Sequence, residues 1–165
     1  LDTSGIMFPK KHTGTEQISE REISLTGISE NMASDRMEKI EQLMSVTDLV
    51  MLDIKHINDE EHQKLTGQSN SNILAFAKYL DSIGKPVWIR HVVVPGITFD
   101  EKELTELGLF LKTLHNVEKL EVLPYHSMGK VKYDNLGMDY VLKDTPQLTK
   151  AEAKEAERII RAAME

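Results

Sequence analysis

The 165-residue sequence predicts an α/β protein in which parallel strands are joined by crossover helices. Short runs rich in valine and isoleucine alternate with segments whose apolar residues recur every three or four positions. This alternation favours a parallel sheet with right-handed crossovers. Polar side chains also stand at the end of each predicted strand, where a barrel of strand–helix units carries its functional groups. We therefore expect part of a TIM-like barrel, because a complete open sheet normally binds its ligand at a single crossover point.

Four segments are predicted as strands. The chain opens on residues 1–5 (LDTSG), which have the character of a strand end, so we interpret the chain as a fragment. The next two runs, residues 47–55 and 86–94, are mostly apolar and β-branched. The last, residues 120–126, contains Pro124, which suits the end of a strand better than its centre.

Helices are predicted between and after these strands. Residues 33–44 and 71–83 each place their apolar side chains on one stripe. Two sequences have the form of a capping box, one beginning at Thr98 and one at Thr149, and each should open a helix. Residues 6–31 are rich in Lys, Thr, Ser and Glu without a sustained period, so we expect a loop insertion within a single domain of residues 1–165.

Composition limits the classes of function. The net charge of -7 argues against a nucleic-acid-binding protein, which needs a basic face. The sequence has neither an apolar stretch long enough to span a bilayer nor a signal-peptide pattern, so a cytoplasmic protein is the default expectation. Cysteine is absent, which excludes disulfides and thiolate-bound metals within these residues.

Charged side chains on the predicted strands are the candidate site. Strand alternation places Asp53 and Lys55 on the same face. Burying these charges is unfavourable unless they satisfy each other, bind a ligand or reach solvent. Arg90 interrupts the third strand and His126 ends the fourth. Two alternatives stay open: Arg90 as a structural ion-pair partner of Asp53, and His126 as a loop histidine satisfied by the backbone.

Other notable residues are predicted to be structural. Trp88 lies two residues deeper in its strand than Arg90, so we expect it in the core and not as a stacking platform. His56, His62 and His91 have no metal-ligand spacing among themselves and are assigned to packing or to the surface.

Three long segments occur in an order that is specific to a known family. They are TDLVMLDIKHIND at residues 47–59, KPVWIRHVVVPGIT at residues 85–98 and EVLPYHSMGKVKYDNLG at residues 121–137. Together with LDTSG at the start, they closely resemble the C-terminal part of the pyruvate formate-lyase activating enzymes. A relative that activates another glycyl-radical enzyme would carry similar segments.

The resemblance implies a radical S-adenosylmethionine enzyme of anaerobic glucose metabolism, of which this chain is the C-terminal half of a partial (β/α)6 barrel. In that family a 4Fe-4S cluster on a CxxxCxxC loop cleaves S-adenosylmethionine, and the 5'-deoxyadenosyl radical oxidises a glycine of pyruvate formate-lyase. Flavodoxin or ferredoxin is implied as the reductant. This sequence has neither the cysteine loop nor the GGE segment of the family, so the cluster ligands are absent and the fragment alone is expected to be inactive.

The resemblance also implies roles for residues at the strand ends, although no catalytic residue is implied within this chain. The residues implied to coordinate a monovalent cation are Asp2, Thr3, Met51 through its carbonyl, and Asp53. A hard cation prefers oxygen ligands and would offset the repulsion between facing carboxylates. The residues implied to contact S-adenosylmethionine are Asp53, Ile54, Lys55, Arg90, Val92 and His126.

Two other classes of function remain as alternatives. One is a non-catalytic module that docks on a glycyl-radical enzyme, with residues 129–137 as an exposed basic and aromatic loop on its binding face. The other is a Schiff-base lyase, in which Lys55 would form an imine with a carbonyl substrate.

Overall fold

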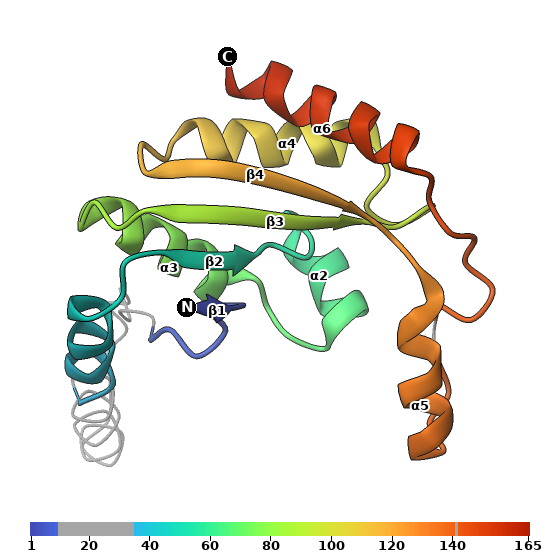
Figure 1. Cartoon of the computed structure of the whole chain (residues 1–165), viewed down its shortest axis with the longest axis horizontal. Coiled ribbons are helices and arrows are strands. Elements are labelled where there is room, and N and C mark those ends of the chain that lie inside the picture. The colour runs from blue at the N-terminus through green and yellow to red at the C-terminus, as the bar shows by residue number, and fades with distance from the viewer. Residues whose placement is uncertain (10–34, 141) are drawn as a thin grey trace, which may run out of the picture.

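The computed structural model of the chain describes residues 1–9, 35–140 and 142–165. In these residues four strands form one sheet in the order β1-β2-β3-β4, and every neighbouring pair is parallel. The strands are β1 (Asp2–Thr3), β2 (Val50–Asp53), β3 (Val87–Val93) and β4 (Val117–Pro124). This sheet, shown in Figure 1, confirms the predicted parallel α/β fold. Closure into a partial barrel stays a prediction.

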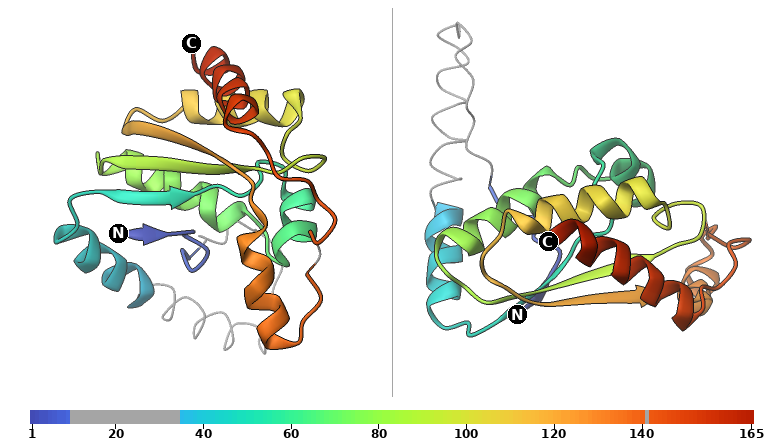
Figure 2. Two further views of the ribbon diagram at one scale, coloured as in Figure 1. Left: turned by 45° about the vertical axis from the view of Figure 1, so that its right-hand side comes forward. Right: turned by 90° about the horizontal axis from the view of Figure 1, so that it is seen from above.

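Helices cover one face of the sheet, as the right panel of Figure 2 shows for α3 (Ser71–Ser82) and α4 (Glu101–Lys112), and α6 (Lys150–Met164) packs against α4 and β4. The helical elements are α2 (Asp59–Thr66), α3 (Ser71–Ser82), α4 (Glu101–Lys112), η1 (Ser127–Gly129), α5 (Lys130–Leu136) and α6 (Lys150–Met164). Residues 35–45 are also helical, in agreement with the helix predicted at 33–44. Among the described helices, none has the length and apolar character needed to cross a lipid bilayer.

Strand alternation separates an apolar face from a polar one. In β3, Val87 and Ile89 are fully buried on the helix-covered face, whereas Trp88 and Arg90 are half-buried on the other face. The core on the covered face is completed by aliphatic side chains of the helices, among them Leu80, Leu104, Leu107, Leu111 and Ile160. Burying each such side chain contributes about 1.5–3 kcal/mol. The same packing leaves the polar face of the sheet without a helical cover in the described residues (Figure 2).

The last helix packs tightly on α4. A Cβ built on Gly108 of α4 would meet the carbonyl oxygen of Ile160 and lie 2.6 Å from the Cβ of Ala163. The predicted capping box at Thr149 is confirmed: Glu152 N–H donates to Thr149 Oγ1 at 3.2 Å, and Thr149 N–H donates to the Glu152 carboxylate at 2.8 Å. A defined start and a close helix–helix contact therefore fix α6 over the sheet.

The prediction that Thr98 caps α4 is wrong, because Asp100 is the N-cap and its carboxylate accepts from two backbone N–H groups of the first turn. The Thr98 hydroxyl instead closes the end of β3. It donates to the Val92 carbonyl at 2.9 Å and accepts from Val94 N–H at 2.7 Å. A buried hydroxyl must find such partners, and the turn after β3 supplies them.

Two further predictions need correction. The loop predicted over residues 129–137 is mostly the helix α5, which projects from the carboxyl end of β4 in Figure 1. Trp88 does not lie in the core: it is half-buried on the uncovered face, where Lys119 Nζ lies 4.5 Å from its ring centroid. The ammonium–ring contact gives this tryptophan a partner outside the core.

The loop insertion predicted at residues 6–31 lies outside the described residues, apart from residues 6–9. In that short stretch Phe8 packs against Phe76 and Tyr79 of α3, with ring centroids 5.3 Å apart in both pairs. The segment after β1 is therefore anchored to α3.

Candidate functional site

A charged network lies at the carboxyl ends of β1 and β2 and beside the middle of β3, on the uncovered face of the sheet. Register pairing places Asp53 beside Arg90 and Asp2 beside Met51. Arg90 Nε–H donates to Asp53 Oδ1 at 2.8 Å, and its Nη2–H donates to Asp2 Oδ1. One guanidinium therefore joins the carboxylates of two other strands.

Lys55 extends the network beyond the end of β2. Its ammonium donates to Asp53 Oδ2 at 2.8 Å, so the two oxygens of Asp53 bind two different cations. This contact confirms that Asp53 and Lys55 share a face, as strand alternation predicts. The network holds two carboxylates and two cations, which makes it electrically neutral with its own side chains alone.

Partial burial strengthens these interactions. The side chains of Asp53 and Arg90 are each 21% exposed, whereas that of Asp2 is 55% exposed. Burial lowers the pKa of Arg90, but the charge of Asp53 and the hydrogen bonds to Asp2 and Asp53 outweigh it and raise the pKa. The structural alternative considered for Arg90, an ion pair with Asp53, is thus present in the structure.

The remaining residues of the predicted cation site lie next to this network. Met51 is paired with Asp2, and its side chain shares the half-buried face of Asp53. The Thr3 hydroxyl accepts from Gly5 N–H at 3.0 Å, which orders the turn after β1. All four predicted cation ligands therefore lie on β1 and β2 at one corner of the sheet, but Thr3 pairs with the buried Leu52 and so alternates to the face opposite Asp2.

The predicted cofactor contacts are only partly brought together. Val92 follows Arg90 on the same face of β3 and is half-buried. The side chain of Ile54 is fully buried on the opposite face, and its carbonyl accepts from His91 Nδ1–H, so it meets no ligand through these atoms. His126 follows β4 at the same end of the sheet and is exposed. Within the described residues, no hydrogen bond joins His126 to the charged network.

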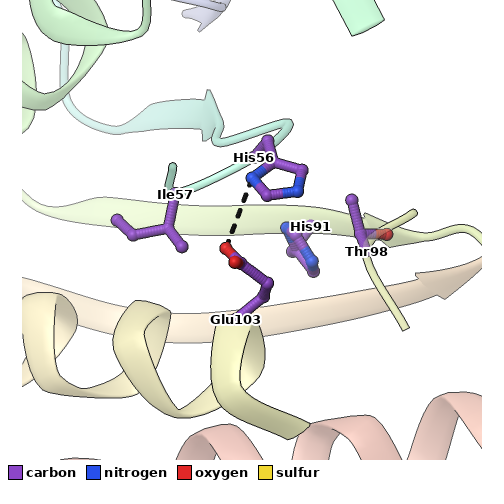
Figure 3. Close-up of a pocket in the computed structure, with 5 residues that line it drawn as sticks. All are labelled: His56, Ile57, His91, Thr98 and Glu103. Atoms are coloured by element: carbon purple, nitrogen blue, oxygen red, sulfur yellow. Dashed lines mark ion pairs between the residues drawn. The ribbon is translucent and has the colours of Figure 1, made fainter. Parts of the chain in front are cut away.

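A second polar cluster lies behind the network on the helix-covered face. Its two histidines are expected from the sequence only to pack or to lie at the surface, and its glutamate carries no prediction. Figure 3 shows His56, His91 and Glu103 lining a shallow pocket. His56 and His91 are 2% and 4% exposed, and His56 Nδ1 lies 3.6 Å from Glu103 Oε2. Glu103 sits in the first turn of α4, and no spacing rule connects it to a histidine that is 47 positions away in the sequence.

Comparison with known proteins links the chain to one group of enzymes. No family model matches the chain. It is 51% identical over 124 residues to the pyruvate formate-lyase-activating enzyme of Streptococcus mutans, an alignment that covers 75% of this chain and 47% of that protein. The enzyme of the same name from Staphylococcus epidermidis is 48% identical over 120 residues, which covers 73% of this chain and 48% of that protein.

A solved structure agrees at the level of the fold. A domain of the pyruvate-formate lyase-activating enzyme from Bacteroides vulgatus superposes with a TM-score of 0.62 at 20% identity, covering 76% of this chain and 69% of that domain. The chain spans about half the length of the curated relatives it matches. These findings confirm the resemblance seen in the sequence: the chain is a homologue of the pyruvate formate-lyase-activating enzymes and corresponds to about half of their length.

Proposed function

We propose that this chain forms the S-adenosylmethionine-binding part of an enzyme that generates the glycyl radical on pyruvate formate-lyase. The observation that carries the proposal is the charged network of Asp2, Asp53 and Lys55 at the carboxyl ends of the parallel strands β1 and β2, joined by Arg90 of the adjacent β3. Carboxyl strand ends are where parallel α/β proteins place their ligands. The homology at about half identity supports the same conclusion.

The network has groups that match a zwitterionic amino-acid cofactor. S-adenosylmethionine has an α-carboxylate, an α-ammonium and a sulfonium. Arg90 and Lys55 can donate to a carboxylate, and Asp53 can accept from an ammonium. Val92 offers an apolar contact beside Arg90. His126 is exposed and follows β4 at the same end of the sheet. We assign Ile54 a supporting role through its buried side chain, because its carbonyl already accepts from His91.

The donor set at the corner of β1 and β2 also fits a monovalent cation. Asp2, Thr3, Asp53 and the Met51 carbonyl supply only oxygen atoms, which hard cations prefer. In the structure Arg90 bridges the two carboxylates. A bound cation would therefore share their negative charge with Arg90 and release part of the guanidinium for the cofactor.

The reactive group comes from elsewhere. A 4Fe-4S cluster in the complete protein would supply the electron that cleaves the cofactor, with flavodoxin or ferredoxin as its source. The chain contains no cysteine and so has no thiolate ligand for the cluster. Its proposed role is to bind and orient the cofactor, and we expect the 165 residues to be inactive alone. The protein partner would be pyruvate formate-lyase.

Isothermal titration of the chain with S-adenosylmethionine tests the proposal. We expect Arg90→Ala and Asp53→Asn each to weaken binding at least about tenfold, because each removes a charge-assisted hydrogen bond. Arg158→Ala is the matched control, since Arg158 pairs with Glu155 on the exposed surface of α6. Equal affinities for Arg90→Ala and Arg158→Ala would contradict the proposal.

The docking alternative keeps one observation in its favour. Exposed large apolar side chains follow β4 on η1, on α5 and just after α5, namely Met128, Val131, Leu136 and Met138. If docking on a glycyl-radical enzyme is the function, Val131→Asp and Leu136→Asp abolish co-purification with that enzyme whereas Arg90→Ala does not. The Schiff-base alternative has no such support, because the Lys55 amine is engaged as an ammonium donor to Asp53.

A further inference from the structure

The uncovered face of the sheet continues past Arg90 onto β4, on the side away from β1 and β2. The register of β4 with β3 places Lys119 beside Trp88 and Glu121 beside Arg90. Residues paired across neighbouring parallel strands project from the same face of the sheet, about 5 Å apart. Arg90 therefore has an acidic neighbour on β4 as well as its register partner Asp53 on β2.

Glu121 is engaged by a different cation. The Lys119 ammonium, two positions earlier on the same face of β4, donates to the Glu121 carboxylate. Nε–H and Nη2–H of Arg90 donate to Asp53 and Asp2, on the opposite side of β3. In the part of the chain that the structure describes, no hydrogen bond joins Arg90 to Glu121. The guanidinium is thus directed toward β1 and β2, although a carboxylate stands next to it on β4.

Trp88 helps to hold Lys119 in this position. The Lys119 ammonium lies 4.5 Å from the centroid of the Trp88 ring, where the electron-rich face of the ring attracts a cation. Trp88 is half-buried and has a register neighbour on each side, Met51 on β2 and Lys119 on β4. Two interactions therefore fix the lysine ammonium, one with the indole and one with Glu121.

Without the charge of Lys119, Glu121 would compete for the guanidinium of Arg90. The side chains of Arg90 and Glu121 are 21% and 31% exposed, so water screens their interaction only in part. A guanidinium has more N–H groups than its bonds to Asp53 and Asp2 use. A carboxylate that lost its own cation would therefore attract Arg90 toward β4 and away from the carboxylates of β1 and β2.

We propose that Lys119 is a positioning residue for the candidate site: held at the Trp88 ring, it pairs with Glu121 and so directs the Arg90 guanidinium toward β1 and β2. The consequence for the cofactor rests on the proposed function, because Arg90 is a group assigned there to the cofactor carboxylate. The direction of Arg90 itself depends on no ligand. The two parts of the proposal therefore have separate tests.

Nitrogen-15 NMR of the arginine side chains tests the direction of Arg90 without any cofactor. The Nε–H signal of Arg90, identified by its loss in Arg90→Ala, reports the hydrogen bond to Asp53. Lys119→Met keeps an apolar stem beside Trp88 but loses the charge, and we expect the signal to move. Adding Glu121→Gln removes the competing carboxylate and should return it, which a merely structural role of Lys119 would not do. An unmoved signal in Lys119→Met, or no return in the double variant, overturns the proposal.

Lys102→Met is the matched control for both measurements. Lys102 lies 3.8 Å from Glu106 on the exposed surface of α4, and its loss changes the net charge of the chain by the same amount. The Arg90 signal should stay in place in this variant.

Isothermal titration with S-adenosylmethionine tests the consequence for the cofactor. We expect Lys119→Met to bind about fivefold more weakly than Lys102→Met, a difference typical of residues within one charged network. Adding Glu121→Gln to Lys119→Met should restore the affinity to within about twofold of the unsubstituted chain. Equal affinities for the two single lysine variants overturn the positioning role. If the unsubstituted chain does not bind the cofactor, the proposed function fails, while the NMR experiment still decides the direction of Arg90.

Discussion

Arg90 is the residue on which the charged network depends, because it is the cation between the carboxylates of Asp2 and Asp53. Arg90→Ala would leave two acidic groups facing each other on neighbouring strands. Removing one member of a part-buried ion pair costs about 1–3 kcal/mol, since the partner keeps its desolvation cost. We therefore expect a loss of this size in the free energy of unfolding, measured with urea near neutral pH.

The control for this loss is Arg158→Ala, which removes an exposed ion pair with Glu155 and should change the urea midpoint little. A cation bound by the freed carboxylates would reduce the loss. Repeating the Arg90→Ala measurement in potassium chloride and in tetramethylammonium chloride at equal ionic strength shows whether this occurs. A loss no greater than that of Arg158→Ala would show that Arg90 is dispensable for the fold.

The sequence predicts only part of this residue-scale arrangement. Alternation along one strand is enough to place Asp53 and Lys55 together. The bridge from Arg90 to Asp2 depends on the pairing of β1 with β2 and of β2 with β3, which no local pattern reports. The contact between His56 and Glu103 is invisible for the same reason, because it joins segments far apart in the sequence.

At the scale of elements, the contact between α4 and α6 depends on Gly108. A methyl group there would meet the Ile160 carbonyl and the Ala163 side chain, and a backbone carbonyl cannot rotate away. Gly108→Ala gains about 1 kcal/mol in helix propensity. Overpacking costs about 1–3 kcal/mol and more when backbone must shift. We expect net destabilisation, seen as a lower melting temperature.

Leu109→Ala is the matched control for this substitution, because the neighbouring side chain is 52% exposed and also lies within α4. Its melting temperature should stay near that of the unsubstituted chain. A Gly108→Ala variant that is as stable as the unsubstituted chain would mean that α6 can move outward without loss of core contacts.

Elements with strong local signals were predicted well, and weak ones were not. The box at Thr149 is confirmed because its two hydrogen bonds involve residues three apart. The capping box predicted at Thr98 is wrong, because the Thr98 hydroxyl donates to the Val92 carbonyl of β3 and Asp100 caps the helix instead. The sequence does not predict α5, because its apolar residues Val131 and Leu136 are exposed and no buried stripe gives it a helical period.

For the whole molecule, alternating strands and helices predicted the parallel sheet because crossover geometry leaves few other arrangements. In β3 every second side chain is buried against the helices, and the side chains between them lie on the uncovered face. The sequence pattern contains that alternation but not which face the helices take. That choice places the charged network on the uncovered face and His91 inside the core.

The buried neutral His91 makes the stability of the whole molecule depend on pH. Burial lowers its pKa from the ordinary 6.5 to about 4. Above pH 6.5 the histidine is neutral in the folded and unfolded chains, so its contribution is complete. As the pH falls from 6.5 to about 4, only the unfolded chain takes up the proton, and the free energy of unfolding falls by about 3 kcal/mol. Below about pH 4 both states are protonated and this contribution stops changing.

Comparison with His91→Gln isolates that contribution from those of the carboxylates, which both proteins share. Glutamine can still donate to the Ile54 carbonyl but does not titrate. Urea unfolding at several pH values between 7 and 4 should therefore give a shallower decline for His91→Gln, with the difference reaching about 3 kcal/mol near pH 4. His126→Gln, a substitution of an exposed histidine, is the control and should keep the steep decline. Parallel curves for His91→Gln and the unsubstituted chain would mean that water reaches His91 in the folded protein.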